Sequence, residues 1–351
     1  MRATDPAQVI RSLCLDPSDF ERFQQEQQQQ QAPLPATPAA EDPHDPTTTL
    51  TSSAYTGGTK LIKVCGITNP EDALVACQAG ANLIGIIFVP KSKRCVTSVE
   101  QAQAVVRAVQ AFGERTGPVE IFGNVQQHQP PPQQEQSKET TTTTNKRKNP
   151  LLHLIASSQA LETASRRCPL VVGVFQNQES EYIKRMVKEC GLDLVQLHGQ
   201  EGMAAANVEL CGAPAIRVVD METDPTFSNE GTTSNPPNNT TSIAESLLAT
   251  LTTCDPIAIL LDTSIKNPAN GGSSGGTGIT FDWNVAQQVQ ASGLPVMIAG
   301  GLEPNNVKDA VGRIRPWGVD VSSGVEIEPG KKDHAKVEEF VKSARAAASS
   351  G

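Results

Sequence analysis

The chain has 351 residues, 38% of them hydrophobic and 19% charged, and its formal net charge is −9. This acidic balance, with no clustered basic face, argues against nucleic acid as a partner, because binding to a phosphate backbone needs lysine and arginine. No apolar run approaches the length of a membrane span, and the first residues lack the cationic-then-apolar order of a secretory signal. These observations predict a water-soluble, cytoplasmic protein.

Cysteine usage points to a reducing compartment and away from metal. The eight cysteines are scattered along the chain, form no C-x-x-C pair and have no histidine at metal-ligand spacing. Such spacing excludes the usual zinc motifs and favours free thiols over a disulfide framework. We therefore expect no metal site.

Three segments have a composition that is poor in large apolar residues. Residues 1–59 contain a glutamine run followed by Pro, Ala and Thr, residues 126–149 combine prolines, glutamines and threonines, and residues 224–241 are similarly polar. Segments of this kind bury too little apolar surface to offset the entropy of ordering. We predict a mostly disordered N-terminal extension (1–59) and a single folded domain (60–349) that carries two low-complexity inserts.

The remaining sequence alternates between short apolar runs and helix-like stretches. Near-continuous Val, Ile and Leu runs of this kind are typical of parallel strands covered by helices. Eight such units in about 250 residues predict a closed (β/α)8 barrel, with an open doubly wound sheet as the alternative. The predicted strands are 61–64, 83–88, 170–175, 193–197, 215–219, 257–261, 295–299 and 318–321.

Two helix starts have recognisable caps. Asn69 precedes Pro70 and two acidic residues, which is an N-cap, a proline in the first turn and favourable charge at the positive end of the helix dipole. Gly80 then suits the C-terminal end of that helix. The segment from Leu302 to Val307 resembles a second helix start.

Active sites of (β/α)8 barrels lie at the C-terminal ends of the strands, so those ends are the candidate site. The first strand ends at Cys65 and the sixth at Asp262, which brings a thiol and a carboxylate to one rim as a potential base and acid. Lys63 leaves the same face of the first strand one layer deeper. The fourth strand ends before His198, and we interpret the fifth as ending in Arg217.

Small residues follow the last two strands. Paired glycines and a Ser-Ser-Gly turn expose backbone N–H groups, and a short helix starting near Ser322 would add its positive end; barrels bind phosphate in this way. A glycine-rich loop at 271–278 suits a flexible lid whose N–H groups join the same site. The predicted phosphate-binding residues are Gly276, Gly278, Gly300, Gly301, Ser322, Ser323 and Gly324.

The strand-end motifs, taken together and in order, resemble the phosphoribosylanthranilate isomerase family of tryptophan biosynthesis. Some of the motifs look especially like those of fungal members. The resemblance covers the barrel and neither the extension nor the inserts. It rests on KVCGITNPEDA, GIIFVPKSKRCV, VGVFQNQ, VQLHGQE, LLDT, GGTGITFDW, IAGGLEPNNV and GVDVSSGVE.

The resemblance implies an Amadori rearrangement of a small phosphosugar adduct, N-(5-phosphoribosyl)anthranilate, without a cofactor or metal. It implies Cys65 as general base, Asp262 as general acid and Arg94 as the group that binds the anthranilate carboxylate. A free thiol is mostly protonated at neutral pH, and a carboxyl is mostly ionised, so each role requires a shifted pKa. His198 matches the family's QLHG histidine, and we expect it either to orient its loop or to contact substrate. Lys63 is a second such candidate.

Other interpretations remain open at this point. A histidine-pathway sugar isomerase would place an aspartate where this chain has Cys65, and indole-glycerol-phosphate synthase needs lysine and glutamate at strand ends that do not carry them here. A barrel retained as a non-catalytic scaffold is the alternative outside enzymology. No obligate protein partner is predicted.

Overall fold

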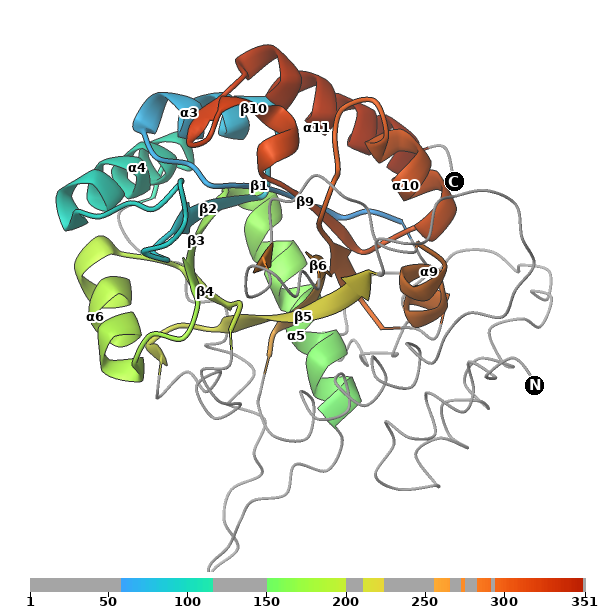
Figure 1. Ribbon diagram of the computed structural model, residues 1–351, viewed down its shortest axis with the longest axis horizontal. Coiled ribbons are helices and arrows are strands. Elements are labelled where there is room, and N and C mark those ends of the chain that lie inside the picture. Colours follow the sequence, from blue (N-terminus) through green and yellow to red (C-terminus); the bar gives the residue numbers. More distant parts are fainter. Residues whose placement is uncertain are drawn as a thin grey trace, which may run out of the picture.

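The computed structural model describes residues 58–115, 150–199, 211–223, 256–265, 273–274, 283–291 and 294–349. Within these ranges a ring of parallel strands is surrounded by helices (Figure 1). The sheet order β5-β4-β3-β2-β1-β9-β8-β6 is closed by direct pairing of β5 with β6. This closure confirms the predicted (β/α)8 barrel and excludes the open doubly wound sheet. Residues 1–57 and the inserts at 126–149 and 224–241 lie outside the described residues.

All eight predicted strands are present in the barrel, and β7 adds a short antiparallel pairing to β6. Two strands are longer than their apolar runs: β5 ends at Thr223 and β6 at Ile265, because these two strands keep pairing beyond the hydrophobic residues. The interpretation that strand five ends at Arg217 is therefore wrong. The strands are β1 Leu61–Cys65, β2 Leu83–Ile87, β3 Leu170–Phe175, β4 Leu194–Leu197, β5 Ala215–Thr223, β6 Ala258–Ile265, β7 Ser273–Ser274, β8 Val296–Ile298 and β9 Gly318–Val321.

The predicted cap is found at Asn69, whereas the second predicted helix begins at Val307 without a side-chain cap. The Asn69 side chain accepts a hydrogen bond of 2.8 Å from the backbone of Asp72, and Gly80 ends the helix in the left-handed region at φ 103°. Asn306 precedes α10, where its side chain bonds the backbone of the preceding loop rather than the helix. The helices are α3 Pro70–Ala79, α4 Val99–Phe112, α5 Pro150–Arg167, α6 Ser180–Cys190, α9 Trp283–Ala291, α10 Val307–Ile314 and α11 His334–Ser349.

Buried apolar side chains form two clusters on opposite faces of the strands. One cluster lies between the strands and the surrounding helices, and includes Ile62, Val64 and Ile84. The other fills the inside of the barrel, and includes Leu61 and Leu260. Since side chains alternate across a strand, the inward positions nearer the C-terminal ends carry the polar residues described below.

Helix α5, which the sequence patterns do not predict, covers the bottom of the barrel. Leu161 packs into the interior cluster, and Ser158 donates a hydrogen bond of 3.0 Å to the carbonyl of Ile257, just before β6. Asn82, just before β2, donates to the carbonyl of Ser165. In Figure 1 the helix crosses the centre of the ring. The N-terminal end of the barrel is thus closed, which leaves the C-terminal end for a site.

A short element follows β9 and leads into α11. It consists of a 3-10 turn η3 (Ser323–Val325) and a hairpin of β10 (Glu326–Glu328) with β11 (Lys331–Lys332). The helix expected near Ser322 is therefore a single 3-10 turn, because the chain enters β10 at Glu326.

Candidate active site

The thiol of Cys65 lies inside the barrel at the end of β1, in a space that Gly85 provides. Cys65 is only 6% exposed, and it is the register partner of Gly85 on β2. A Cβ at residue 85 would lie 2.7 Å from the sulfur, which is closer than side chains pack. Glycine in mid-strand is unfavourable, and here it allows the sulfur to occupy the barrel interior.

A buried ion pair lies one layer below the thiol. Lys63 is fully buried in β1, and its Nζ donates a hydrogen bond of 2.9 Å to Oδ2 of Asp320, its register partner in β9. Burial opposes the charge of Lys63, but Asp320 and Cys65 outweigh it, so the pKa of this lysine is raised. Lys63 is thus a cation held beside Cys65.

The environment of Cys65 acts on its ionisation in two directions. Burial is the largest influence and raises the pKa of the thiol; Asp320 adds to that shift. Lys63 and, more weakly, Lys332 favour the thiolate, but burial prevails. The cations that lower the pKa of a reactive thiol are therefore present, while the net direction is upward.

Asp262 shares its surroundings with His198 and with a second carboxylate, Asp220, that sequence reasoning missed. Nε2 of His198 lies 3.3 Å from Oδ1 of Asp220 and 3.6 Å from Oδ2 of Asp262. Asp220 and Asp262 are register partners on β5 and β6. Burial disfavours the imidazolium, but both carboxylates favour it and the pKa of His198 is raised. The signal for Asp220 was its inward position, in step with Ile216 and Val218.

Arg217, taken from the sequence as the end of strand five, instead faces away from the interior. Its guanidinium donates to the carbonyl of Leu197 at 3.2 Å and to that of Gly199 at 2.6 Å. The backbone N–H of His198 also donates to the carbonyl of Phe175 at 2.9 Å. The loop after β4 is therefore held through its backbone, independently of the His198 ring.

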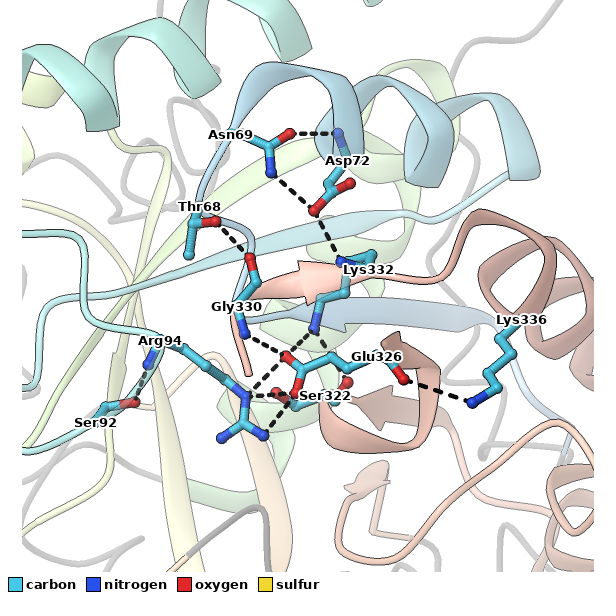
Figure 2. Close-up of polar contacts among 10 residues, drawn as sticks. All are labelled: Thr68, Asn69, Asp72, Ser92, Arg94, Ser322, Glu326, Gly330, Lys332 and Lys336. Atoms are coloured by element: carbon cyan, nitrogen blue, oxygen red, sulfur yellow. Dashed lines mark hydrogen bonds and ion pairs between the residues drawn. The ribbon is translucent and has the colours of Figure 1, made fainter. Parts of the chain in front are cut away.

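Arg94 forms a bidentate ion pair with Glu326, as Figure 2 shows. Its Nε and Nη2 donate to the carboxylate at 2.7 to 3.0 Å, and Nζ of Lys332 donates to Oε1 at 2.9 Å. Burial would raise the pKa of Glu326, but the two cations outweigh it and the pKa is lowered. One edge of the Arg94 guanidinium is thus fixed, which orients the remaining edge and Nη1. The sequence left Glu326 unassigned.

The hairpin also connects Arg94 with the loop after β9. Lys332 donates a second bond of 3.0 Å to the carbonyl of Ser322, and Figure 2 shows its side chain directed between Ser322 and Glu326. A Cβ on Gly66 would lie 2.7 Å from Cδ of Arg94 and 3.0 Å from Oγ of Ser322. The side chain of Arg94 therefore lies near both Ser322 and the end of β1.

Of the predicted phosphate-binding residues, five lie in the described loops after β8 and β9, and the other two lie in the glycine-rich loop, outside the described residues. Gly300 and Gly301 have φ of 90° and 62°, so both need the left-handed region that favours glycine. A Cβ on Gly324 would lie 2.0 Å from the carbonyl oxygen of Leu302, so the loops after β8 and β9 touch there. Oγ of Ser322 is buried without a hydrogen-bond partner among the described residues. Gly276 and Gly278 lie outside the described residues.

In the described part of the chain, no cluster of three or more His, Cys, Asp or Glu side chains is arranged to hold a metal ion. All six cysteines described there are free thiols. None of the helices found in these ranges is long and apolar enough to cross a membrane.

Comparison with known proteins identifies the family. The family model for N-(5'-phosphoribosyl)anthranilate (PRA) isomerase matches residues 132–343. This chain belongs to the phosphoribosylanthranilate isomerase family. The resemblance found in the strand-end motifs is confirmed, although Cys65 and Arg94 precede the matched segment and His198 and Asp262 fall within it.

Individual relatives agree with this assignment. A tryptophan biosynthesis protein TRP1 of Phytophthora nicotianae is 39% identical over 290 residues, covering 81% of this chain and 47% of that protein. The chain therefore spans about half the length of that relative. An N-(5'-phosphoribosyl)anthranilate isomerase of Geobacter sp. (strain M21) is 33% identical over 284 residues, covering 81% of this chain and 97% of that enzyme.

Among solved structures, the N-(5'-phosphoribosyl)anthranilate isomerase of Pyrococcus furiosus aligns with a TM-score of 0.50 at 20% identity. The alignment covers 82% of this chain and 98% of that one. At this identity the likeness concerns the fold, and it agrees with the closed barrel.

Proposed function

We propose that the chain isomerises N-(5-phosphoribosyl)anthranilate to the 1-deoxyribulose 5-phosphate adduct, with Cys65 as general base and Asp262 as general acid. The observation that carries the proposal is the placement of the two groups in one closed barrel. Cys65 ends β1 in the barrel interior, and Asp262 lies in β6 at 3.6 Å from Nε2 of His198, which follows β4. The thiol and the Asp262–His198 group therefore line one interior, as a two-group proton transfer requires.

The reaction begins with two proton transfers, one from Asp262 and one to Cys65, and ends with a tautomerisation. Asp262 gives a proton to the ring oxygen, the C1–O bond breaks, and the nitrogen lone pair forms an iminium at C1. The Cys65 thiolate then takes the C2 proton, and the C–H electron pair forms the enaminol. The O2 proton then passes to water and C1 takes a proton from water, which gives the ketone. Lys63 is the positive charge against which the thiolate forms.

Arg94 and the loops after β8 and β9 supply the binding groups in this proposal. Glu326 fixes Nε and Nη2 of Arg94, so Nη1 is presented to the anthranilate carboxylate. Gly300, Gly301 and the Ser322 hydroxyl are proposed to hold the phosphate. Oδ1 of Asp320 is buried without a partner among the described residues, which suits acceptance of a bond from a substrate hydroxyl.

The test is the wild-type activity of the full-length chain with two variants and a matched control. The wild type should remove the fluorescence of the anthranilate adduct and restore growth of a tryptophan auxotroph that lacks this step. Cys65→Ala and Asp262→Asn should lose both activities. Cys77→Ala removes a different buried cysteine, which lies in α3 and not in the barrel interior, and should keep both activities.

Two results would contradict the proposal. Inactivity of a folded wild type would favour a non-catalytic scaffold. Wild-type rates in both site variants would exclude the roles of Cys65 and Asp262.

A further inference from the structure

The His198 ring connects a solvent-exposed carboxylate with a buried one. Nε2 contacts Asp220 at 3.3 Å and Asp262 at 3.6 Å, and the exposed fractions of the three side chains are 44% for Asp220, 12% for His198 and 10% for Asp262. The three groups thus form a path from solvent to the proposed acid. Only Asp262 and His198 were expected from the sequence.

The proposed reaction creates a need for such a path. Each turnover leaves Asp262 as a carboxylate and Cys65 as a thiol, although the substrate has only been isomerised. Before the next turnover Asp262 must regain a proton and Cys65 must lose one. Since Asp262 is largely covered, direct exchange of its proton with bulk water is restricted.

We propose that Asp220 and His198 form a proton relay that returns a proton from solvent to Asp262 after each turnover. The inference rests on the proposed function of Asp262. The Nε2–H bond of the imidazolium breaks and an O–H bond forms on Oδ2 of Asp262. The neutral ring then takes a proton from Asp220, which solvent or a buffer acid has protonated. One proton enters by this route while Cys65 releases one, so the cycle balances.

The charges around His198 support a proton-carrying role. Asp220, Asp262 and Asp320 favour its imidazolium, whereas Lys63 and burial oppose it. The balance raises the pKa of His198, so the ring carries an exchangeable proton over more of the neutral range.

A purely structural role accounts less well for the ring. The backbone on either side of His198 is already held by Phe175 and Arg217. The ring is therefore not needed to fix the loop.

The test separates a single turnover from repeated turnover in the full-length chain. With enzyme in excess over substrate, one turnover uses the proton already on Asp262, and Asp220→Asn should match the wild type. In steady state Asp262 must be reprotonated, and kcat should fall about tenfold or more, a modest part of the usual contribution of acid–base catalysis. KM should fall in proportion, so that kcat/KM keeps its wild-type value, because the slowed step follows product formation.

Buffer dependence and NMR give readouts that a structural role would not move. Raising the concentration of a neutral buffer acid such as imidazolium should restore the steady-state rate of Asp220→Asn. The ring nitrogens of His198 should titrate at lower pH in this variant. His198→Gln should show the same difference between single and repeated turnover, and Asp309→Asn, an exposed carboxylate on α10, should behave as wild type.

The proposal is overturned if Asp220→Asn keeps the wild-type kcat at low buffer concentration. It is also overturned if single-turnover and steady-state rates fall together, or if the lost rate does not respond to buffer. Failure of the proposed function is a different result, namely a folded wild type that forms no product in either regime.

Discussion

Replacing Gly85 by alanine tests the role of Cys65 by changing the space around its sulfur while leaving the thiol in place. A Cβ at this position would lie 2.7 Å from Sγ, whereas ordinary contacts begin at 3.4 Å. The sulfur must therefore move by 0.7 Å, the difference between these distances, or β1 and β2 must separate. Either response displaces the proposed base from the substrate carbon.

The displacement should lower both the rate and the stability by amounts that can be estimated. A misplacement of about 1 Å costs roughly 100-fold in rate, so we expect kcat of Gly85→Ala to fall about 10- to 100-fold. Overpacking a well-filled interior should also cost about 1–3 kcal/mol in the free energy of unfolding. Gly318→Ala is the matched control, because its Cβ would lie 2.8 Å from Cγ of Met297, another side chain of the interior cluster. It should lose similar stability and retain kcat.

The assay combines three measurements on the full-length chain. The loss of anthranilate fluorescence gives kcat, urea unfolding gives stability, and mass spectrometry follows alkylation of the Cys65 peptide. The reasoning is refuted if Gly85→Ala loses stability but keeps the wild-type kcat. It is equally refuted if Gly318→Ala loses as much activity as Gly85→Ala.

Three further predictions concern ionisable groups. Because burial raises the pKa of Cys65, kcat/KM should rise with pH through an ionisation above the ordinary thiol range; a rise complete below neutral pH, measured in the same profile, would contradict this. Burial raises the pKa of Glu326, but Arg94 and Lys332 together outweigh it and the pKa is lowered. The ionised carboxylate therefore stabilises the fold above the usual carboxyl range, and this stability is lost as pH falls through the lowered pKa; urea unfolding of Glu326→Gln should lack that loss. Asp193→Ala should lower the free energy of unfolding in urea by about 3–5 kcal/mol, because Arg115 loses the buried carboxylate to which it is bonded at 2.7 and 2.9 Å. A cost near zero would show instead that the pair is solvated.

The predictable parts of the fold are those that short stretches of sequence determine on their own. The strands of the barrel appear as apolar runs, and the cap at Asn69 with its proline and acids lies within one turn of its helix. Once the strands are known, the closed topology brings their C-terminal ends together. Cys65 and Asp262 are therefore predictable as candidate site residues from the sequence alone.

The contacts that were not predictable join residues far apart in the chain. Lys63 and its partner Asp320 are separated by 257 positions, and Arg94 and Glu326 by 232. Local patterns do not specify which strand or hairpin supplies a partner, since that depends on sheet register. The same reason hid Asp220, because the apolar run of its strand ends at Val219 and only the pairing of β5 with β6 continues it.

Violations of strand propensity nevertheless mark the site. Charged residues are almost never fully buried unless paired, and glycine weakens a strand interior, yet Lys63, Gly85, Asp220, Asp262 and Asp320 all occupy strands of the barrel. Gly85 borders the sulfur of Cys65, and Lys63 and Asp320 influence the pKa of that thiol. The other two, Asp220 and Asp262, flank His198. A sequence that departs from local rules at several positions around one site gives up stability there, which is expected where function requires it. Applied to strand five, this criterion selects Asp220, in phase with Ile216 and Val218, over the outward-facing Arg217.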